Sequence, residues 1–167
     1  MNSEEKTIKR AIPEMKIIRE VNIQAEDFYD DAVALGDLAA VTLKAAHRSQ
    51  MTSLENIAES TLKTSDVFDY IKKQTARFPY WRQSAPGQNT SGGFGERLRT
   101  YLENDLKKRL DDICGPQRLH IGNAAGEDMQ ERRRIYLLLI RQFIRQLVVE
   151  YEYQVSLGQN NHKKRGE

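Results

Sequence analysis

The stretch IYLLLIRQFIRQLV at residues 135–148 decides the fold of this 167-residue chain. Its apolar side chains recur every three or four residues, which is the spacing of one face of an α-helix. The same spacing continues in both directions, so we expect a single helix over about residues 127–157, ended by Gly158. Because this is the most apolar helix in the sequence, we expect it to be the spine of the core.

Helical patterns also fill the part of the chain before this spine. Residues 15–23 alternate only in part and predict either a short extended arm or a first helix. From Gln24 to Leu62 the apolar residues follow the helical period, as one long helix or as two helices with a kink. Gly36 lies inside this pattern, where it weakens a helix and indicates a close helix crossing.

Two more helices and two loops complete the pattern. Thr64-Ser65-Asp66 is a helix N-cap signal, and the helix that it begins should end near Arg77, because a proline two residues later disfavours helical geometry. Another amphipathic helix is expected over residues 96–113. A long loop, residues 78–95, lies between these helices, and a second loop follows at residues 114–126. The length of the first loop indicates a segment that is functional or mobile.

These elements predict an all-α fold, a bundle of about four to six helices around one core. Residues 1–157 then form a single helical domain with a flexible loop at 78–95, and residues 158–167 form a disordered, basic tail. A chain of 167 residues is long enough to bury such a core.

The composition indicates where the protein resides. The longest apolar run, Ile135–Ile140, is much shorter than the ~20 residues that a membrane-spanning helix needs. The first residues carry no apolar segment of the signal-peptide type. Cys114 is the only cysteine, which excludes an intramolecular disulfide and suits a reducing compartment. We therefore expect a cytoplasmic protein without membrane contact.

The net charge of +2 hides an uneven distribution. Residues 1–62 carry 7 Lys and Arg against 11 Asp and Glu, a net charge of −4. Residues 63–167 carry 19 Lys and Arg against 13 Asp and Glu, a net charge of +6. Such a protein can bind an anionic partner through its basic side, or it can pair with copies of itself, acidic end to basic end.

The segment RFPYWR at residues 77–82 places aromatic rings beside guanidinium groups. Aromatic faces stack on bases and adjacent cations neutralise phosphates, so Tyr80 and Trp81 are candidates for contact with a nucleic acid. The same two side chains can instead pack onto the helical core, or they can form a hot spot for a protein partner.

Basic residues flank this segment and recur in compact groups further along the chain. Arginine suits phosphate because its planar guanidinium donates several hydrogen bonds in a fixed geometry. If their helices lie side by side, these cations form a surface that follows a nucleic-acid backbone; otherwise they only solvate helix faces. With the two aromatic residues, the candidate nucleic-acid-binding residues are Lys72, Lys73, Arg77, Tyr80, Trp81, Arg82, Arg97, Arg99, Lys107, Lys108, Arg109, Arg132, Arg133 and Arg134.

Catalytic and metal-binding signals are absent from the sequence. His47, His120 and His162 are scattered and do not have the spacing of zinc ligands. The glycine cluster at residues 92–95 lacks the lysine and the preceding strand of a phosphate-binding P-loop, and we expect it to be a flexible hinge. We therefore expect no enzyme activity, no metal and no cofactor.

Two short segments carry a resemblance to a known family. LKTSDV at residues 62–67 begins a short helix, and FIRQLVVEYEY at residues 143–153 closes the last one. Together they resemble the small helical subunit of type III CRISPR effector complexes. The resemblance implies a non-catalytic antiviral-defence protein that stacks in several copies along the duplex of guide RNA and target. Its basic residues would contact the nucleic-acid backbone.

The sequence therefore predicts a non-catalytic accessory subunit that binds the backbone of RNA or single-stranded DNA within a larger nucleoprotein assembly. The alternative is a protein–protein adaptor, or a homo-oligomer, without nucleic-acid binding. In that case a partner is expected on four residues beside the main apolar stripe of the last helix, namely Tyr136, Leu137, Ile140 and Tyr153.

Overall fold

The structure, a computed structural model, describes residues 11–87 and 92–163. All regular secondary structure in these residues is helical, so the predicted all-α fold is confirmed. The helices are α1 (Glu14–Asp27), α2 (Tyr29–Leu43), α3 (Arg48–Ser60), α4 (Thr64–Arg77), α5 (Pro79–Arg82), α6 (Phe94–Thr100), α7 (Leu106–Ile113) and α8 (Glu127–Lys163). A π-helical turn, Tyr101–Asp105, joins α6 to α7. The described part of the chain thus has seven separate helices, one of them the single turn α5, close to the predicted four to six.

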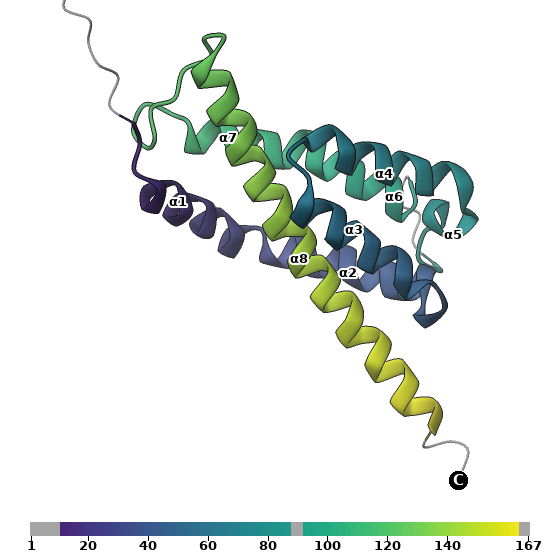
Figure 1. Cartoon of the computed structure of the whole chain (residues 1–167). Coiled ribbons are helices and arrows are strands. Elements are labelled where there is room, and N and C mark those ends of the chain that lie inside the picture. Colours follow the sequence, from purple (N-terminus) through teal and green to yellow (C-terminus); the bar gives the residue numbers. More distant parts are fainter. Residues whose placement is uncertain (1–10, 88–91, 164–167) are drawn as a thin grey trace, which may run out of the picture.

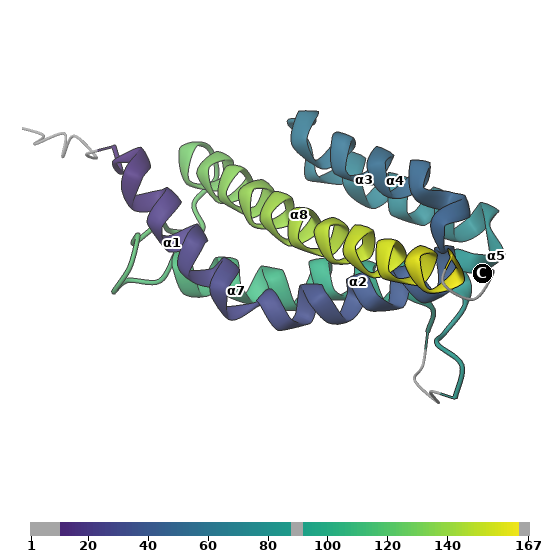
Figure 2. The same cartoon turned by 90° about the horizontal axis from the view of Figure 1, so that it is seen from below.

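Helix α8 is the spine of the fold. It runs through the middle of the molecule, with α3 and α4 on one side and α1, α2 and α7 on the other (Figure 2). Its C-terminal end extends past the ends of α2 and α3 (Figure 1). Its fully buried side chains come largely from the predicted stripe and include Ile135, Leu139, Phe143, Ile144, Leu147 and Tyr151.

The C-terminal limit of α8 differs from the prediction. We expected Gly158 to end the helix, but α8 continues to Lys163, so the first residues of the predicted disordered tail are helical. Gly158 lies in open space, with no atom within 4 Å of the position that a Cβ would take. A lone glycine in an exposed helix costs about 1 kcal/mol relative to alanine, which is too little to stop an established helix. Residues 164–167 lie outside the described residues.

The segment at residues 15–23 belongs to a helix and not to an extended arm. Pro13 precedes α1, and its carbonyl accepts a hydrogen bond from the Lys16 N–H at 3.0 Å. The break between α1 and α2 falls at Phe28, inside the pattern that we expected to be helical from Gln24 onward. Phe28 is fully buried, and its ring meets the Phe143 ring of α8 edge-on with centroids 5.4 Å apart.

Gly36 is the point where α2 crosses α8. A Cβ on Gly36 would lie 2.7 Å from the Glu150 Cβ and 2.7 Å from the Leu147 carbonyl oxygen, so a larger residue does not fit without a shift. The close crossing predicted from this glycine is confirmed. After α2 the chain turns at Lys44, which has a φ of 54°, so residues 24–62 form separate helices and not one long helix.

The helix predicted over residues 96–113 is present, with a π-helical turn in its middle. There the Leu106 N–H bonds to the carbonyl of Tyr101, five residues earlier. The carbonyl of Leu102 accepts a hydrogen bond at 2.6 Å from the Tyr136 hydroxyl of α8. Burial raises the pKa of Tyr136 to about 12, which keeps the hydroxyl protonated and able to donate. This bond ties the continuous helix α6–α7 to the spine.

Candidate functional site

The aromatic segment, residues 78–82, forms a turn of helix after α4, and Trp81 is its buried residue. Pro79 begins α5, where a helix needs no N–H donor. Trp81 is fully buried, its indole N–H donates to Gln50 Oε1 at 2.6 Å, and its ring packs on Phe94 with centroids 5.0 Å apart. Trp81 therefore has no free ring face for a base. The sequence left several roles open for Trp81. The structure shows that it packs onto the core, and its buried ring is not placed for the predicted base stacking.

Tyr80 is half-buried among other side chains. The His47 ring stacks on it with centroids 3.7 Å apart and an interplanar angle of 9°, and the Phe78 centroid lies 5.3 Å away. Its hydroxyl accepts a hydrogen bond from Gln50 Nε2. The backbone carbonyl of Gln50 also accepts a bond from the Tyr70 hydroxyl at 2.7 Å. Gln50 thus holds the aromatic segment in place. The sequence did not predict this role, because one polar residue within a helix gives no signal.

The glycines after this segment are points of close packing. A Cβ on Gly95 would lie 2.0 Å from Thr75 Oγ1, and a Cβ on Gly93 would lie 2.1 Å from the carbonyl carbon of Arg82. Gly92 has a φ of +97°, a conformation that favours glycine. We predicted a flexible hinge here, whereas the structure explains Gly93 and Gly95 by the close approach of α6 to α5 and α4, and Gly92 by its positive φ.

Arg82 is held at the C-terminal end of α4. Its Nη1 donates to the carbonyls of Thr75 and Ala76, both at 2.9 Å. Carbonyls in the last turn of a helix lack partners within that helix, so the guanidinium supplies the missing donors. Arg82 is therefore committed to the fold, although the sequence made it a candidate phosphate ligand.

Arg99 and Arg109 also bind groups inside the molecule. Arg99 forms ion pairs with Glu96 at 2.5 Å and Glu103 at 2.6 Å, one turn away on either side. Arg109 donates to Gln24 Oε1 of α1 at 2.9 Å. Both guanidinium groups already have acceptors, so they are weaker candidates for phosphate than the sequence indicated.

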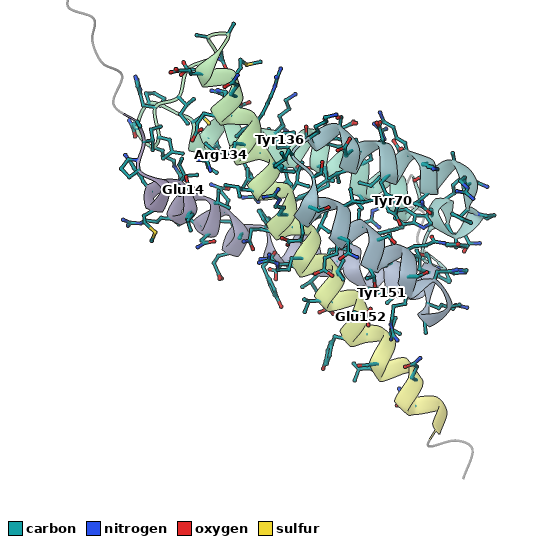
Figure 3. All side chains as sticks on the ribbon, viewed as in Figure 1. Glu14, Tyr70, Arg134, Tyr136, Tyr151 and Glu152 are labelled. Carbon is teal, nitrogen blue, oxygen red and sulfur yellow. The ribbon has the colours of Figure 1, made fainter. Side chains whose placement is uncertain are left out.

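The basic triplet at the start of α8, residues 132–134, contains two arginines that bind other elements and one that is exposed. Arg132 binds Asp111 at 2.9 Å and donates to two carbonyls of the loop before α8. Arg134 binds Glu14 of α1 at 2.8 Å (Figure 3), and this hydrogen bond holds the pKa of Glu14 below its ordinary value. Arg133 lies exposed between them and has no such partner in the described chain. Two of the three arginines therefore fasten elements of the bundle together.

The other seven predicted cations form no hydrogen bond or ion pair within the described residues. Lys72, Lys73 and Arg77 are exposed on α4, and Lys107 and Lys108 are exposed on α7. Helix α4 packs against α6, and α6 continues into α7, which itself packs against α8 and α1. The seven are Lys72, Lys73, Arg77, Arg97, Lys107, Lys108 and Arg133.

The apolar residues predicted to face a protein partner are mostly buried. Tyr136, Leu137 and Ile140 lie in the core, because helices cover α8 on both sides over this part of its length, so the prediction is wrong for these three. Tyr153 is 57% exposed and fits the prediction. One turn before and after it, Val149 and Leu157 are exposed as well.

Within the described ranges, the potential metal-ligating side chains are dispersed. No group of three or more His, Cys, Asp or Glu side chains there is placed to hold a metal ion. Cys114 is buried, and burial raises the pKa of its thiol, which disfavours the nucleophilic thiolate. None of the helices described is long and apolar enough to span a bilayer.

Comparison with known proteins gives no family for this chain. No family model, no curated protein sequence and no solved structure matches it. Its function therefore has to be inferred from the arrangement of its own side chains.

Proposed function

We propose that this protein is a non-catalytic helical subunit that binds the phosphate backbone of RNA or single-stranded DNA inside a larger nucleoprotein assembly. The observation that carries the proposal is the set of exposed cations on α4 and α7 that form no hydrogen bond or ion pair in the described chain. Lys72, Lys73, Lys107 and Lys108 belong to this set. A cation without an internal carboxylate remains available to replace the counterions of a phosphate.

The spacing of the α4 cations suits a nucleic-acid strand. Lys73 and Arg77 are separated by a helix rise of about 6 Å. One strand of a duplex carries a phosphate per about 3.4 Å of its length, so about two phosphates fit along this distance. Lys73 and Arg77 are four residues apart and therefore share one side of α4. Lys107 and Lys108 provide further positive charge on the helix that continues from its neighbour α6.

This surface suits the backbone better than the bases. The ring of Trp81 is buried, and Tyr80 is held by His47 and Gln50, so neither is free to stack on a base. Lysine binds phosphate as a point charge and does not read sequence. We therefore expect binding that is independent of base sequence. This agrees with what the resemblance of residues 62–67 and 143–153 to the small subunit of type III CRISPR complexes implies.

The proposal is tested by titrating labelled single-stranded RNA and DNA with the protein and measuring fluorescence anisotropy at two salt concentrations. The variant combining Lys72→Glu and Lys73→Glu should lower the affinity on the order of tenfold or more and reduce the salt dependence. The variant combining Lys72→Arg and Lys73→Arg keeps both charges and should bind like the wild type. Absence of binding at low salt, or equal loss in both variants, would contradict the proposal.

A protein–protein adaptor is the second candidate function. The observation that favours it is the row of exposed apolar side chains near the C-terminal end of α8, where Val149 is 62% and Leu157 is 41% exposed. Large apolar side chains that gather on one face of a soluble protein mark an interaction site. The two candidates are compatible, because the cations of α4 and α7 and this apolar row involve different residues.

A further inference from the structure

A pocket of about 340 Å³ lies where α2 ends and the chain turns towards α3. Its walls come from residues within 41–47 and from the segment after α5, residues within 83–86. None of the described side chains that line it is a carboxylate, whereas Lys44, His47 and Gln83 carry hydrogen-bond donors. The composition of the wall therefore suits an anion.

The donors of this pocket are not used inside the molecule. In the part of the chain that the structure describes, the side chains of Lys44, His47 and Gln83 form no hydrogen bond or ion pair. The His47 ring stacks on Tyr80, and this contact fixes the ring without occupying its nitrogen atoms. A ligand with several acceptor oxygens would satisfy these donors.

Lys44 is held in a backbone conformation that costs free energy. Its φ of 54° and ψ of −170° fall in a region that is almost restricted to glycine. The hydroxyl of Tyr151, a buried residue of α8, donates a hydrogen bond to the Lys44 carbonyl and so holds the turn. Burial raises the pKa of Tyr151 to about 12, which keeps this donor protonated. A lysine at a position that favours glycine indicates that its side chain is needed there.

The charges around this turn favour a doubly charged anion. Glu152 of α8 lies near the turn, because its charge acts on the Tyr151 hydroxyl, but it forms an ion pair with Arg48 at 3.0 Å. The charge of Lys44 is therefore left for a ligand, and His47 adds a second positive charge whenever its ring is protonated. A phosphate monoester carries about −1.5 to −2 charges at pH 7, whereas a phosphodiester carries a single one.

A series of contacts connects the pocket to the cations of α4. The Arg77 guanidinium lies 5.2 Å from the centre of the Phe78 ring. The centroids of Phe78 and Tyr80 are 5.3 Å apart, and those of Tyr80 and His47 are 3.7 Å apart. Only two rings thus separate Arg77 from His47. A strand that follows α4 past Arg77 needs only a few more nucleotides to reach the pocket.

We propose that this pocket binds a terminal phosphate of the RNA or DNA strand whose backbone lies along α4. The inference rests on the proposed function and adds to it a preference for the end of a strand. Lys44 and His47 contact the phosphate oxygens, and Gln83 donates a further hydrogen bond. An internal phosphodiester carries less charge and continues in both directions, so it matches the pocket less well.

The test compares three versions of one short single-stranded RNA, labelled at an internal base. They carry a phosphate at the 5′ end, at the 3′ end, or at neither end, and fluorescence anisotropy at low salt measures the affinity for each. A phosphate at one of the two ends should raise the affinity about tenfold, as expected for a contact with a charged donor. Adenosine monophosphate alone should bind much more weakly, because it makes no contact along α4.

Variants of Lys44 connect this preference to the pocket. Lys44→Gln should abolish it. Lys16→Gln, which removes an exposed lysine of α1, is the matched control and should keep it. Lys44→Gly should also abolish the preference, yet it should unfold at a higher temperature than Lys44→Gln, because glycine adopts this conformation without strain. A lower thermal midpoint for the glycine variant would contradict the argument that strain is tolerated here for the lysine side chain.

Three binding results would overturn the proposal. They are equal affinity for the three RNAs, a preference that survives Lys44→Gln, and adenosine monophosphate that binds as tightly as the phosphorylated RNA. If all three RNAs bind equally well, backbone binding stands and only the terminal-phosphate site falls. If none of them binds at low salt, both proposals fall, so the two failures are distinguishable.

Discussion

Residues 72–77 and residues 78–82 are adjacent in the sequence but have opposite roles in the structure. The first segment ends α4 and carries Lys72 and Lys73, which are exposed and without partners in the described chain. The second forms α5 and contains Trp81, which is fully buried and bonded to Gln50. The difference shows that cations and aromatic rings that are neighbours along a chain need not share a surface. In this protein the rings hold the fold, and the two lysines are exposed to solvent.

The largest effect is expected from Trp81→Ala. Removal of a fully buried indole leaves a cavity and orphans Gln50 Oε1, so the free energy of unfolding should fall by about 3–5 kcal/mol. Tyr153→Ala removes an exposed ring and should change it by less than about 0.5 kcal/mol. Urea denaturation followed by circular dichroism measures both. Similar values for the two variants would mean that the aromatic segment is not part of the core.

An intermediate effect is expected where α6 approaches the aromatic segment. Gly95→Ala places a methyl group 2.0 Å from Thr75 Oγ1 and 3.2 Å from the Trp81 ring, so it should cost about 1–3 kcal/mol. Gly158→Ala is the matched control, because that position on α8 is open and alanine favours the helix by up to about 1 kcal/mol. Opposite shifts in the thermal midpoint are therefore expected. A gain in stability from both changes would rule out close packing at Gly95.

The smallest changes in the free energy of unfolding are expected for Arg132 and Arg133, two neighbours in the triplet at the start of α8. Arg132→Ala removes bonds to Asp111 and to two loop carbonyls, and we expect a loss of about 1–2 kcal/mol. Arg133→Ala removes an exposed cation without partners in the described residues, so its effect should stay within about 0.5 kcal/mol. Thermal unfolding compares them directly. If Arg133→Ala destabilises the protein as much as Arg132→Ala, cations with internal partners do not differ from exposed cations in their contribution to stability.

Much of the fold follows from local sequence patterns. Helix α4 ends at Arg77 as expected, since a proline follows two residues later. Its start differs in detail, because the predicted cap residues 64–66 form the first turn and the N-cap is Lys63, which makes no side-chain capping bond. The spine begins at Glu127, and the loop at residues 114–126 precedes it as expected. The break at Phe28 was not predictable, because a large apolar residue in a helical period looks the same inside a helix as between two helices.

Less of the candidate site follows from the sequence. The pattern identifies which residues are cationic, but the groups that bind five of them lie on other turns, loops or helices. Arg134, for example, reaches Glu14, which is far away in the sequence, and Arg82 turns back to the carbonyls that end α4. Such pairings depend on how distant parts of the chain pack, whereas the two partners of Arg99 lie one turn away on its own helix. The sequence alone could therefore list the candidate cations but could not separate the bound ones from the free ones.

One titration tests most directly whether the cations of residues 72–77, and not the aromatic rings of residues 78–82, contact a nucleic acid. Trp81 is the only tryptophan, so its emission reports on the aromatic segment while the anisotropy of a labelled single-stranded RNA reports on binding. We expect binding at low salt that weakens steeply as salt is added, with the emission of Trp81 unchanged. Binding that quenches Trp81 would place the aromatic segment in the site, and no binding at low salt would remove nucleic acid as the partner.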